Sequence, residues 1–472
     1  MSRPNYEELG FKCGIEIHQQ LEGKKLFCNC PTDIRKDKPD FEIVRRLRAS
    51  AGEEGRVDAA ALHEQKKQKY FIYQGYYDLT CGVELDEEPP QPTNTEALKT
   101  ALRVAKMLGC RIVDKIQVMR KTVIDGSNVS GFQRTALIGM NGCLEVGGKM
   151  YGIESVCLEE EACQLVKRTE DHDIYNLSRL GIPLLEIATA PDMKTPEEAR
   201  EVAAKIGMIL RSTGSCKRGI GSIRQDVNLS IKGGSRVEIK GFQELKSIPK
   251  VIEYEVERQL KIIKNGEKMK EEVRKAEADL TTSFLRPMPG TDRMYPETDI
   301  PEITPNVKGI EAIKTIEERI EEAMGQFSLA KELATQAVKA GIDLAGYAER
   351  YANLEPKFIA DTLINAPKEI KARFKKEVDA LKHADELFDK VNRGELPKGA
   401  VFEILSEIAH GKKPDLSGYK SLSAKELEAE IITLVKKQKD ATTQALMGLI
   451  MGKHRGKVDG KTVMDLLKKH KK

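Results

Sequence analysis

The sequence predicts an α+β fold: a mostly antiparallel sheet with helices comes first, followed by an all-α helical domain and a small α-helical tail domain. Strand-like alternation recurs over residues 11–305, and turns such as Asp125-Gly126 separate the strands. After a proline-rich segment at residues 299–305, the composition shifts to Ala, Leu, Glu and Lys, which indicates helices. A second break at residues 394–398 leads us to expect domains over residues 1–308, 309–395 and 396–472.

One helix of the first domain is marked at both ends. Thr195 and Glu198 form a capping box, and Pro196 occupies the first helical position. Apolar residues then recur at helical spacing, and Gly214 provides a suitable stop. We therefore expect a helix that starts at Pro196 and ends near Gly214.

The composition is that of a folded protein. The chain has 472 residues, of which 40% are hydrophobic and 32% charged. No apolar run approaches the ~18 residues that span a bilayer. Residues 1–10 lack a signal-peptide pattern, so we expect a cytoplasmic protein. The nine cysteines are an odd number spread along the chain, which favours reduced thiols over disulfides. The net charge of +4 says little about partners.

Three strand-like segments carry polar residues on one side only. In residues 14–20, alternation puts Glu16 and His18 on one face and two isoleucines on the other. A glutamate and a histidine two residues apart can reach the same cation. In residues 222–231, the polar face carries Ser222, Arg224, Asp226, Asn228 and Ser230. Residues 236–240 repeat the pattern, with Glu238 and Lys240 on the polar side.

Two further segments carry carboxylates within or directly after apolar stretches. Glu186 lies within residues 182–189, which are otherwise mostly apolar, and burial of an unpaired carboxylate is costly. An acidic triplet, Glu159, Glu160 and Glu161, follows a short apolar stretch. Each pattern has a structural alternative. Glu186 would form an ion pair, the triplet would be a solvated turn, and the polar strand faces would face water.

Taken together, these segments favour a cleft that holds a metal ion and phosphate. Oxygen ligands with one histidine suit Mg²⁺ or Mn²⁺, and Arg224 and Lys240 suit phosphate oxygens. The chain has no Gly-x-x-x-x-Gly-Lys-Ser/Thr loop, no Gly-x-Ser-x-Gly elbow and no His-Glu-x-x-His motif. Cys28 and Cys30 could begin a zinc site, but no second Cys-x-x-Cys follows. We therefore expect free buried thiols there.

The C-terminal end of the chain is basic. From Leu449 onward, eight Lys or Arg residues face only two Asp residues. A basic cluster that ends a helical domain is typical of phosphate contacts, and the alternative is a solvated basic terminus.

These segments resemble the B/E family of tRNA-dependent amidotransferase subunits over nearly the whole chain. The similarity rests on residues 14–20, 26–31, 120–121, 125–134, 158–162, 181–187, 222–230, 286–290, 293–301 and 451–459. The runs at residues 18–20, 132–134 and 293–299 look closer to the archaeal E-type subunit than to the bacterial B-type subunit. The E-type subunit normally has an insertion, similar to one in bacterial aspartyl-tRNA synthetases, where residues 265–284 bridge the gap here.

The resemblance implies a catalytic cradle, a helical domain and a small tail domain that contacts tRNA. It also implies a glutaminyl-tRNA synthase of the glutamine-hydrolysing type, which is a carbon–nitrogen ligase. With ATP and Mg²⁺, such an enzyme phosphorylates the glutamyl side chain of Glu-tRNA(Gln), and ammonia then converts it to Gln-tRNA(Gln). The ammonia comes from a partner, which for the E-type subunit is the asparaginase-like D-type subunit of the amidotransferase, in a heterodimer or heterotetramer.

The resemblance also implies roles for particular residues. The metal ligands would be Glu16, His18, Glu159 and Glu186, with Asp226 and Glu238 as additional ligands. The catalytic residues would be Glu16, His18, Glu159, Glu186, Arg224 and Asp226. The nucleotide would be bound by Ser222, Arg224, Asn228, Ser230 and Lys240. The tRNA would be bound by Lys453, Arg455 and Lys457. Alternation independently supports four ligands, but it does not select Glu159 over its acidic neighbours.

Several alternatives stay open at this point. Arg120 and Lys121 would approach the tRNA 3′ end or form surface ion pairs. Arg293 and Tyr295 would contact the acceptor terminus, unless the tyrosine packs in the core. A bacterial B-type subunit with an amidase-type partner would perform the same chemistry. A tRNA-binding scaffold without catalysis is the remaining hypothesis.

Overall fold

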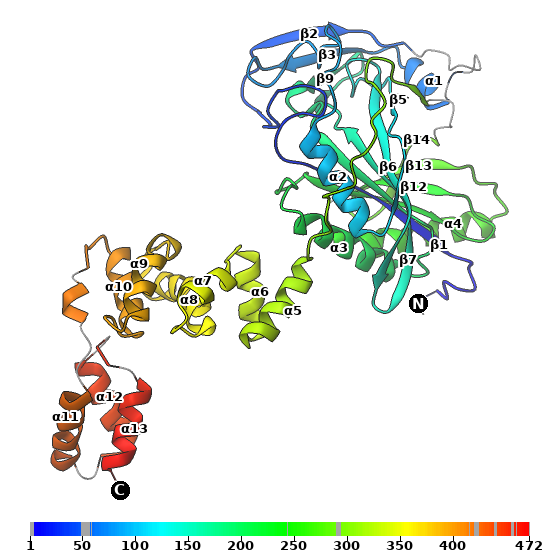
Figure 1. Ribbon diagram of the computed structural model, residues 1–472. Coiled ribbons are helices and arrows are strands. Elements are labelled where there is room, and N and C mark those ends of the chain that lie inside the picture. Colours follow the sequence, from blue (N-terminus) through cyan, green and yellow to red (C-terminus); the bar gives the residue numbers. More distant parts are fainter. Residues whose placement is uncertain are drawn as a thin grey trace. The chain divides into compact units, whose positions relative to one another are not determined.

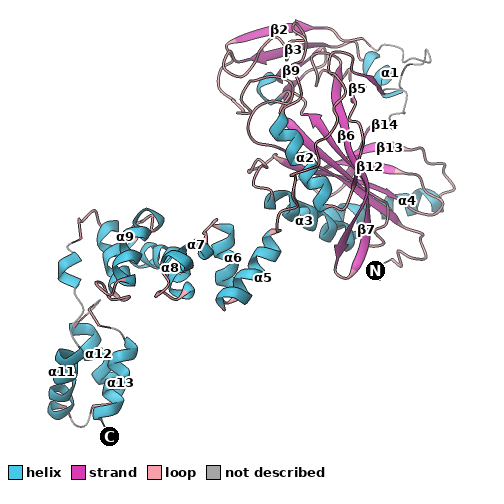
Figure 2. Cartoon of the chain, viewed as in Figure 1, coloured by secondary structure: helices cyan, strands magenta, loops and turns pink. Residues whose placement is uncertain are grey.

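The computed structural model describes most of the chain (Figure 1). The described residues are 4–48, 57, 59–242, 244–288, 294–414, 416–419, 424–438, 441–454, 457–458 and 460–471. Contacts divide the chain into two compact units, Met1–Thr315 and Ile316–Lys472. Among the described residues, the strands all belong to the first unit, and the second unit contains helices and loops (Figure 2). The division into three domains at residues 308 and 395 stays a prediction.

The first unit is built around one large sheet. Its strand order is β14-β13-β12-β11-β1-β10-β7-β6-β5-β15, and β4 pairs with β6. The strands are β1 (Lys12–Gln20), β4 (Arg111–Ile112), β5 (Val118–Thr122), β6 (Phe132–Val146), β7 (Lys149–Glu160), β10 (Pro183–Thr189), β11 (Ile223–Ser230), β12 (Val237–Phe242), β13 (Glu272–Ala276), β14 (Thr282–Pro287) and β15 (Met294–Pro296). All neighbours in this sheet are antiparallel except β12 and β13. The predicted α+β fold with a mostly antiparallel sheet is confirmed.

A smaller sheet of the first unit has the order β2-β3-β9-β8. Its strands are β2 (Phe41–Arg45), β3 (Tyr70–Gly75), β8 (Gln164–Arg168) and β9 (His172–Asn176). Two tyrosines tie it to the turn between β5 and β6. Tyr73 donates its hydroxyl hydrogen to the carbonyl of Gly126, and Tyr175 donates to the carbonyl of Asp125, both at 2.8 Å. The Asp125-Gly126 turn is therefore anchored to this sheet.

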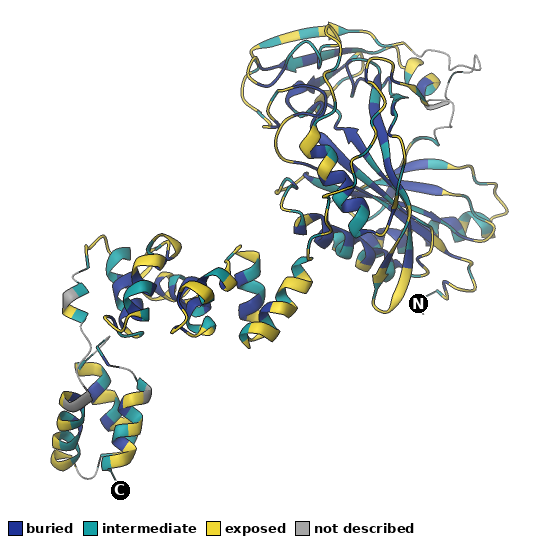
Figure 3. Cartoon of the chain, viewed as in Figure 1, coloured by how far each residue is buried: buried dark blue, intermediate teal, exposed yellow. Residues whose placement is uncertain are grey.

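Four α-helices of the first unit pack against the large sheet or against each other. They are α1 (Ala59–Gln65), α2 (Thr95–Met107), α3 (Pro196–Ser212) and α4 (Ile248–Lys264). Helix α2 contacts β6 and β7, α3 contacts β1, and α4 contacts α3 and β11. Figure 3 shows that the central strands of the sheet are mostly buried. The core of the unit lies between these strands and the helices.

Helix α3 has the ends that the sequence predicts. The hydroxyl oxygen of Thr195 accepts a hydrogen bond from the backbone N–H of Glu198 at 3.2 Å. The Glu198 carboxylate in turn accepts from the backbone N–H of Lys194 at 2.7 Å. The first bond satisfies a backbone donor that a helix start leaves open, and the second ties the residue before the cap to the first turn. Two residues after Ser212, Gly214 has a φ of +74°, a conformation that side-chain-bearing residues rarely adopt.

The bridge between α4 and β14 is short. After Lys264 the chain turns through Gly266, whose φ is +72°, and enters β13. Strand β13 pairs in parallel with β12 and antiparallel with β14. Where the resemblance leads us to expect a missing insertion, the chain thus adds strands to the edge of the large sheet.

The second unit is helical. Its α-helices are α5 (Ile316–Phe327), α6 (Lys331–Lys339), α7 (Leu344–Arg350), α8 (Pro356–Phe374), α9 (Leu381–Asn392), α10 (Ala400–Ala409), α11 (Ala424–Lys437), α12 (Thr443–Lys453) and α13 (Gly460–His470). One apolar cluster extends from Ala323 to Leu405, and a separate one extends from Leu427 to Leu467. Short 3₁₀ helices occur at Leu177–Arg179, Leu245–Ser247 and Leu416–Tyr419.

Two further features concern the chain as a whole. Within the described residues, no helix has both the length and the apolar character that a membrane crossing requires. All nine cysteines are free, which agrees with the prediction of reduced thiols.

Candidate active site

Five adjacent strands of the large sheet bring the predicted polar side chains onto one face. In the pairing of β1 with β11, Glu16 lies opposite Asp226 and His18 lies opposite Arg224. In the pairing of β1 with β10, His18 also lies opposite Glu186. Directly opposed residues of antiparallel strands point to the same face of a sheet. Side chains from distant parts of the sequence therefore gather along β12, β11, β1, β10 and β7.

The opposite face of these strands is apolar. Ile15 and Ile17 of β1 are buried, as are Val227 and Leu229 of β11. Helices α3 and α4 cover this side, since α3 contacts β1 and α4 contacts β11. The apolar face fixes the register of the strands, because a slip by one residue would turn the polar side chains into the core.

A cavity of about 540 Å³ lies over the polar face. Its lining includes all six predicted metal ligands and two predicted phosphate-binding cations: Glu16, His18, Glu159, Glu186, Arg224, Asp226, Glu238 and Lys240. Two smaller cavities share lining residues with it. One of about 420 Å³ shares Asp125, Lys240 and Arg286, and one of about 260 Å³ shares Glu16 and Arg236.

Two sets of side chains in this cavity could each hold a metal ion, and both sets include His18. Glu16, His18 and Asp226 form one set, and His18, Glu159 and Glu186 form the other. Within each set the potential ligand atoms lie within 4.8 Å of one another. The Nδ1 atom of His18 is buried and has no hydrogen-bond partner among the described residues. A histidine with an unpaired ring nitrogen, beside carboxylates that could act as ligands, fits a divalent cation such as Mg²⁺ or Mn²⁺.

Burial and neighbouring charges give these carboxyl groups different acidities. Burial raises the pKa of Glu16 to about 7, and the negative charge of Glu186 adds to this increase. Burial acts on Glu186 in the same direction. However, the positive charge of Lys121 and the hydrogen bond with His18 outweigh it, and the pKa of Glu186 lies below its usual value. The Nε2 atom of His18 and the Oε2 atom of Glu186 are 3.2 Å apart.

The cations of the cavity are held by carboxylates. Lys240 donates to Asp226 at 2.8 Å and also pairs with Glu238. Arg224 donates to Glu161 at 2.8 Å. In both pairs burial opposes the ionised carboxylate, but the partner cation outweighs burial. The pKa of Asp226 lies below its usual value, and the pKa of Glu161 is about 2. The cations are therefore oriented before a substrate arrives.

The acidic triplet divides between the two faces of the sheet. Glu159 faces the cavity and accepts from Lys121 at 2.7 Å, and Glu161 pairs with Arg224. Glu160 points away from the cavity and accepts from Arg134. Because side chains alternate along β7, Glu160 points to the face opposite that of Glu159. The sequence does not reveal which of the two faces meets the cavity. Once Glu159 is assigned, the two-residue spacing also identifies Glu161, which the sequence analysis missed.

Not all predicted nucleotide ligands reach the main cavity. Ser222 precedes β11 and donates its hydroxyl hydrogen to the carbonyl of Gly219 at 2.8 Å. Asn228 and Ser230 line the neighbouring 260 Å³ cavity. Asn228 still touches the site, because its side-chain amide donates to Glu16 at 3.1 Å. The polar face of β11 is thus continuous, but it is longer than the main cavity.

Of the residues that the sequence suggests for contact with the tRNA 3′ end, one lines the cavity and others form structural contacts elsewhere. Lys121 lines the cavity and contacts Glu159. Arg120 forms an ion pair with the buried Glu297 at 2.6 Å. An ion pair is the alternative to a tRNA contact for Arg120. The ring of Tyr295 lies edge-on to Phe132, with a centroid separation of 6.4 Å. Arg293 lies outside the described residues.

The ion pairs of Glu297 predict an acid dependence of stability. Burial opposes ionisation, but hydrogen bonds from Arg120, Asp299 and Arg134 outweigh it and lower the pKa of Glu297 to about 2. A lowered folded-state pKa contributes stability above the ordinary value of about 4.5, and this contribution is lost as the pH falls toward 2. We expect the stability difference between wild type and Glu297→Gln to shrink over that range in urea unfolding measured by circular dichroism. A difference that stays constant would contradict this prediction.

In the tail, the predicted tRNA-binding lysines lie near α12. Lys453 ends this helix, is 66% exposed and pairs with Glu430 at 2.5 Å. Lys457 follows in the connection to α13, and Arg455 lies outside the described residues. The structure thus describes two of the three side chains.

Known proteins with similar sequences show the family to which this chain belongs. The profile described as the GatB/GatE catalytic domain matches residues 11–320, which include all the strands of the cavity. Three relatives named as the E-type subunit of glutamyl-tRNA(Gln) amidotransferase are similar over almost their whole length. The protein of Methanocaldococcus jannaschii is 38% identical, with 98% of this chain and 99% of that protein covered. That of Archaeoglobus fulgidus is 37% identical, with 98% of each chain covered, and that of Methanosarcina barkeri is 35% identical, with 99% of each covered.

The chain therefore belongs to the GatB/GatE family, and these relatives carry the name of the E-type subunit. The predicted resemblance is confirmed. The alignment with the Methanocaldococcus jannaschii protein extends over 625 positions, although this chain has 472 residues. That relative thus carries additional sequence, which agrees with the predicted lack of an insertion.

Proposed function

We propose that this protein is the subunit that phosphorylates and amidates the glutamyl side chain of Glu-tRNA(Gln), in the cytoplasm. The observation that carries the proposal is the shared cavity. It combines two potential metal-ligand sets with the cations Lys121, Arg224 and Lys240. The names of the relatives, which specify glutamyl-tRNA(Gln), support the substrate.

The chemistry explains why such a cavity is needed. A carboxylate resists direct amidation because oxide is a poor leaving group. Transfer of the γ-phosphoryl group from ATP to a carboxylate oxygen gives an acyl phosphate and ADP. Ammonia then attacks the acyl carbon, the bond to the phosphate oxygen breaks, phosphate leaves, and the nitrogen loses a proton. Positioning and charge neutralisation supply most of the catalysis of phosphoryl transfer.

The two sets that share His18 are the residues that would hold Mg²⁺. The orphaned Nδ1 atom and the oxygen-rich surroundings support this assignment. Bound Mg²⁺ would supply charge neutralisation at phosphate oxygens. Glu238 and Asp226 also position Lys240, so they serve the site even where they do not touch the metal.

Arg224 and Lys240 are the groups that we propose for binding phosphate oxygens. Arg224 is held at 2.8 Å by Glu161, and Lys240 is held at the same distance by Asp226. Groups fixed in advance require little reorganisation when charge develops in the transition state. Asn228 bonds to Glu16 and lines the adjoining cavity, and both contacts support the proposal that it binds the rest of the nucleotide.

The tRNA end would enter through the neighbouring 420 Å³ cavity. Its lining has five cationic side chains and three acidic ones: Lys67, Lys69, Arg168, Lys240, Arg286, Glu64, Asp125 and Asp173. An excess of positive charge along a cavity attracts a phosphate backbone. This cavity meets the main one at Asp125, Lys240 and Arg286, so a terminal aminoacyl group would arrive at the metal-ligand sets.

The ammonia would come from another chain. Free ammonia is mostly protonated to ammonium at neutral pH, and ammonium is not a nucleophile, so a partner must deliver ammonia along a sheltered path. We propose the asparaginase-like D-type subunit as that partner, because the relatives are named as E-type subunits.

The direct test combines the full chain with the asparaginase-like partner, Glu-tRNA(Gln), ATP and Mg²⁺, and follows glutamine attached to the tRNA. We expect ATP cleavage that requires both Glu-tRNA(Gln) and Mg²⁺. Activity only with an amidase-type partner would favour the bacterial type of complex. Metal-independent tRNA binding without an acyl phosphate would instead favour a scaffold and overturn the proposal.

A second test concerns the tail. Replacing Lys453, Arg455 and Lys457 by glutamine is expected to weaken tRNA binding and to flatten its salt dependence. Each lost phosphate contact makes the negative slope of log K against log salt shallower, by roughly 0.7 to 0.9 on the scale of single-stranded and double-stranded nucleic acids. Filter binding of Glu-tRNA(Gln) between low and moderate salt measures both quantities.

The matched control replaces three exposed lysines elsewhere in the second unit, Lys339, Lys357 and Lys376. It removes the same charge, so it separates a local contact from the net charge of the protein. An equal slope for the tail variant and the control would mean that the tail lysines are only solvated surface.

A further inference from the structure

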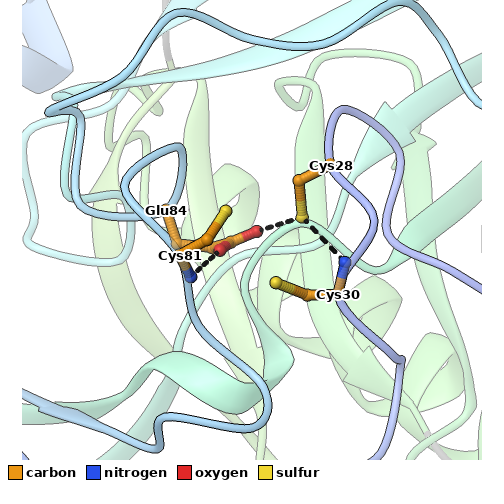
Figure 4. Close-up of side chains that lie close together, drawn as sticks. All are labelled: Cys28, Cys30, Cys81 and Glu84. Atoms are coloured by element: carbon orange, nitrogen blue, oxygen red, sulfur yellow. Dashed lines mark hydrogen bonds between the residues drawn. The ribbon is translucent and has the colours of Figure 1, made fainter.

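A cluster of three thiols and one carboxylate lies outside the candidate active site. Cys28 and Cys30 belong to the loop that follows β1, and Cys81 and Glu84 belong to the loop that follows β3. Their potential ligand atoms all lie within 4.8 Å of one another. Figure 4 shows the four side chains of the two loops turned toward one another.

Hydrogen bonds fix this arrangement. The thiol of Cys28 lies 2.8 Å from the Oε1 atom of Glu84. The other carboxylate oxygen of Glu84 accepts from the backbone N–H of Cys81 at 2.8 Å. The backbone N–H of Cys30 donates to the sulfur of Cys28 at 3.4 Å. The loops are therefore held with all four potential ligands around one point.

We propose that Cys28, Cys30, Cys81 and Glu84 bind one structural zinc ion. Zinc prefers four ligands in a tetrahedron and accepts thiolates and carboxylates, whereas thiolates are poor ligands for Mg²⁺ and Ca²⁺. Zinc–sulfur bonds of about 2.3 Å place tetrahedral sulfurs roughly 3.8 Å apart, which is compatible with the observed grouping. Four protein ligands leave no open position, so the role is structural.

A buried cation beside the cluster supports this assignment. Zinc with three thiolates and one carboxylate carries a formal charge of about −2. The side chain of Lys25 is fully buried, and its Nζ atom lies 3.6 Å from Glu84. It also donates to the carbonyl of Leu79 at 2.7 Å. A lysine in this position offsets part of the negative charge that the bound metal leaves.

The site would join two loops that the sequence separates. The first loop directly follows β1, which carries Glu16 and His18, and the second follows β3 of the smaller sheet. Sequence spacing alone does not disclose the site, because the second pair of ligands is Cys81 and Glu84 rather than a second Cys-x-x-Cys. The ion would therefore fix the end of a strand that lines the candidate active site.

The test measures metal content and ligand chemistry in the full chain. We expect one zinc per chain by inductively coupled plasma mass spectrometry after purification and dialysis. Cobalt substitution should give the visible bands of a tetrahedral site and thiolate-to-cobalt charge transfer in the near ultraviolet. That charge transfer distinguishes this site from the oxygen-rich cavity, and neither readout depends on tRNA or ATP.

Variants assign the ligands. Cys81→Ser should lose zinc or bind it at least tenfold more weakly, and Glu84→Gln should weaken zinc while keeping the thiolate-to-cobalt bands. Cys143→Ser, an exposed and free cysteine of β6, is the control and should retain full zinc. The proposal is overturned if the zinc-supplied wild type binds no zinc and shows no thiolate-to-cobalt band. It is also overturned if the cluster cysteines form a disulfide in place of metal binding.

Discussion

Glu186→Gln is expected to reduce ATP cleavage that depends on Glu-tRNA(Gln) by about 10³-fold, the scale of losing one preorganised charged group at a reacting centre. Glutamine keeps the size of the side chain but removes its negative charge. Glu186 is one of three side chains in a metal-ligand set and lies 3.2 Å from the imidazole of His18. The low pKa that Lys121 and His18 impose keeps it ionised at neutral pH. The measurement is steady-state ADP release with saturating Glu-tRNA(Gln) and Mg²⁺.

The control for this variant is Glu145→Gln, which changes an exposed glutamate of β6. It should leave ADP release unchanged. Urea unfolding should show that Glu186→Gln is still cooperatively folded under the assay conditions, although it loses the ion pairs with His18 and Lys121, so that lost activity is not lost folding. Full ATP cleavage by a folded Glu186→Gln protein would remove this residue from the proposed site.

Glu297→Gln should lower the free energy of unfolding of the first unit by about 3 kcal/mol, because it breaks a buried network from one side. Glu297 is 2% exposed and accepts from Arg120 at 2.6 Å and from Arg134 at 2.7 Å. Arg134 is itself buried, so the substitution removes a charge partner from a buried guanidinium. Urea unfolding at neutral pH measures the loss.

Glu302→Gln is the matched control for this variant. Glu302 forms an exposed ion pair with Lys115 at 2.9 Å, and exposed pairs contribute between about 0 and 1 kcal/mol. A loss for Glu297→Gln no larger than that of the control would mean that Arg134 finds other partners. The network would then contribute little to the cohesion of β5, β6 and β15.

Much of the local structure follows directly from the sequence. The period of two in β1 and β11 separates Ile15 and Ile17 from Glu16 and His18, and the structure has this division. The cap at Thr195 likewise predicts the start of α3. Both features depend on residues within a few positions of one another. Backbone geometry therefore determines them without knowledge of the rest of the chain.

Other features needed the tertiary structure. Strand alternation cannot tell Glu159 from Glu160, because a period of two holds equally well whichever of them faces the cavity. The pairing of β7 with β10 settles which face holds Glu159. Ser222 has the correct parity but precedes β11, and it bonds to Gly219 outside the main cavity. Cys81 and Glu84 reach Cys28 only through the folding of two loops.

The sequence by itself determined which side chains share a strand face, where a helix begins, and which family the chain resembles. Only the tertiary structure decided which strands are neighbours, and therefore which carboxylates share a cavity with which cations. The physical reason lies in the range of the interactions. Backbone periodicity and capping act over a few residues, whereas strand order and loop convergence depend on pairing between segments far apart in the chain.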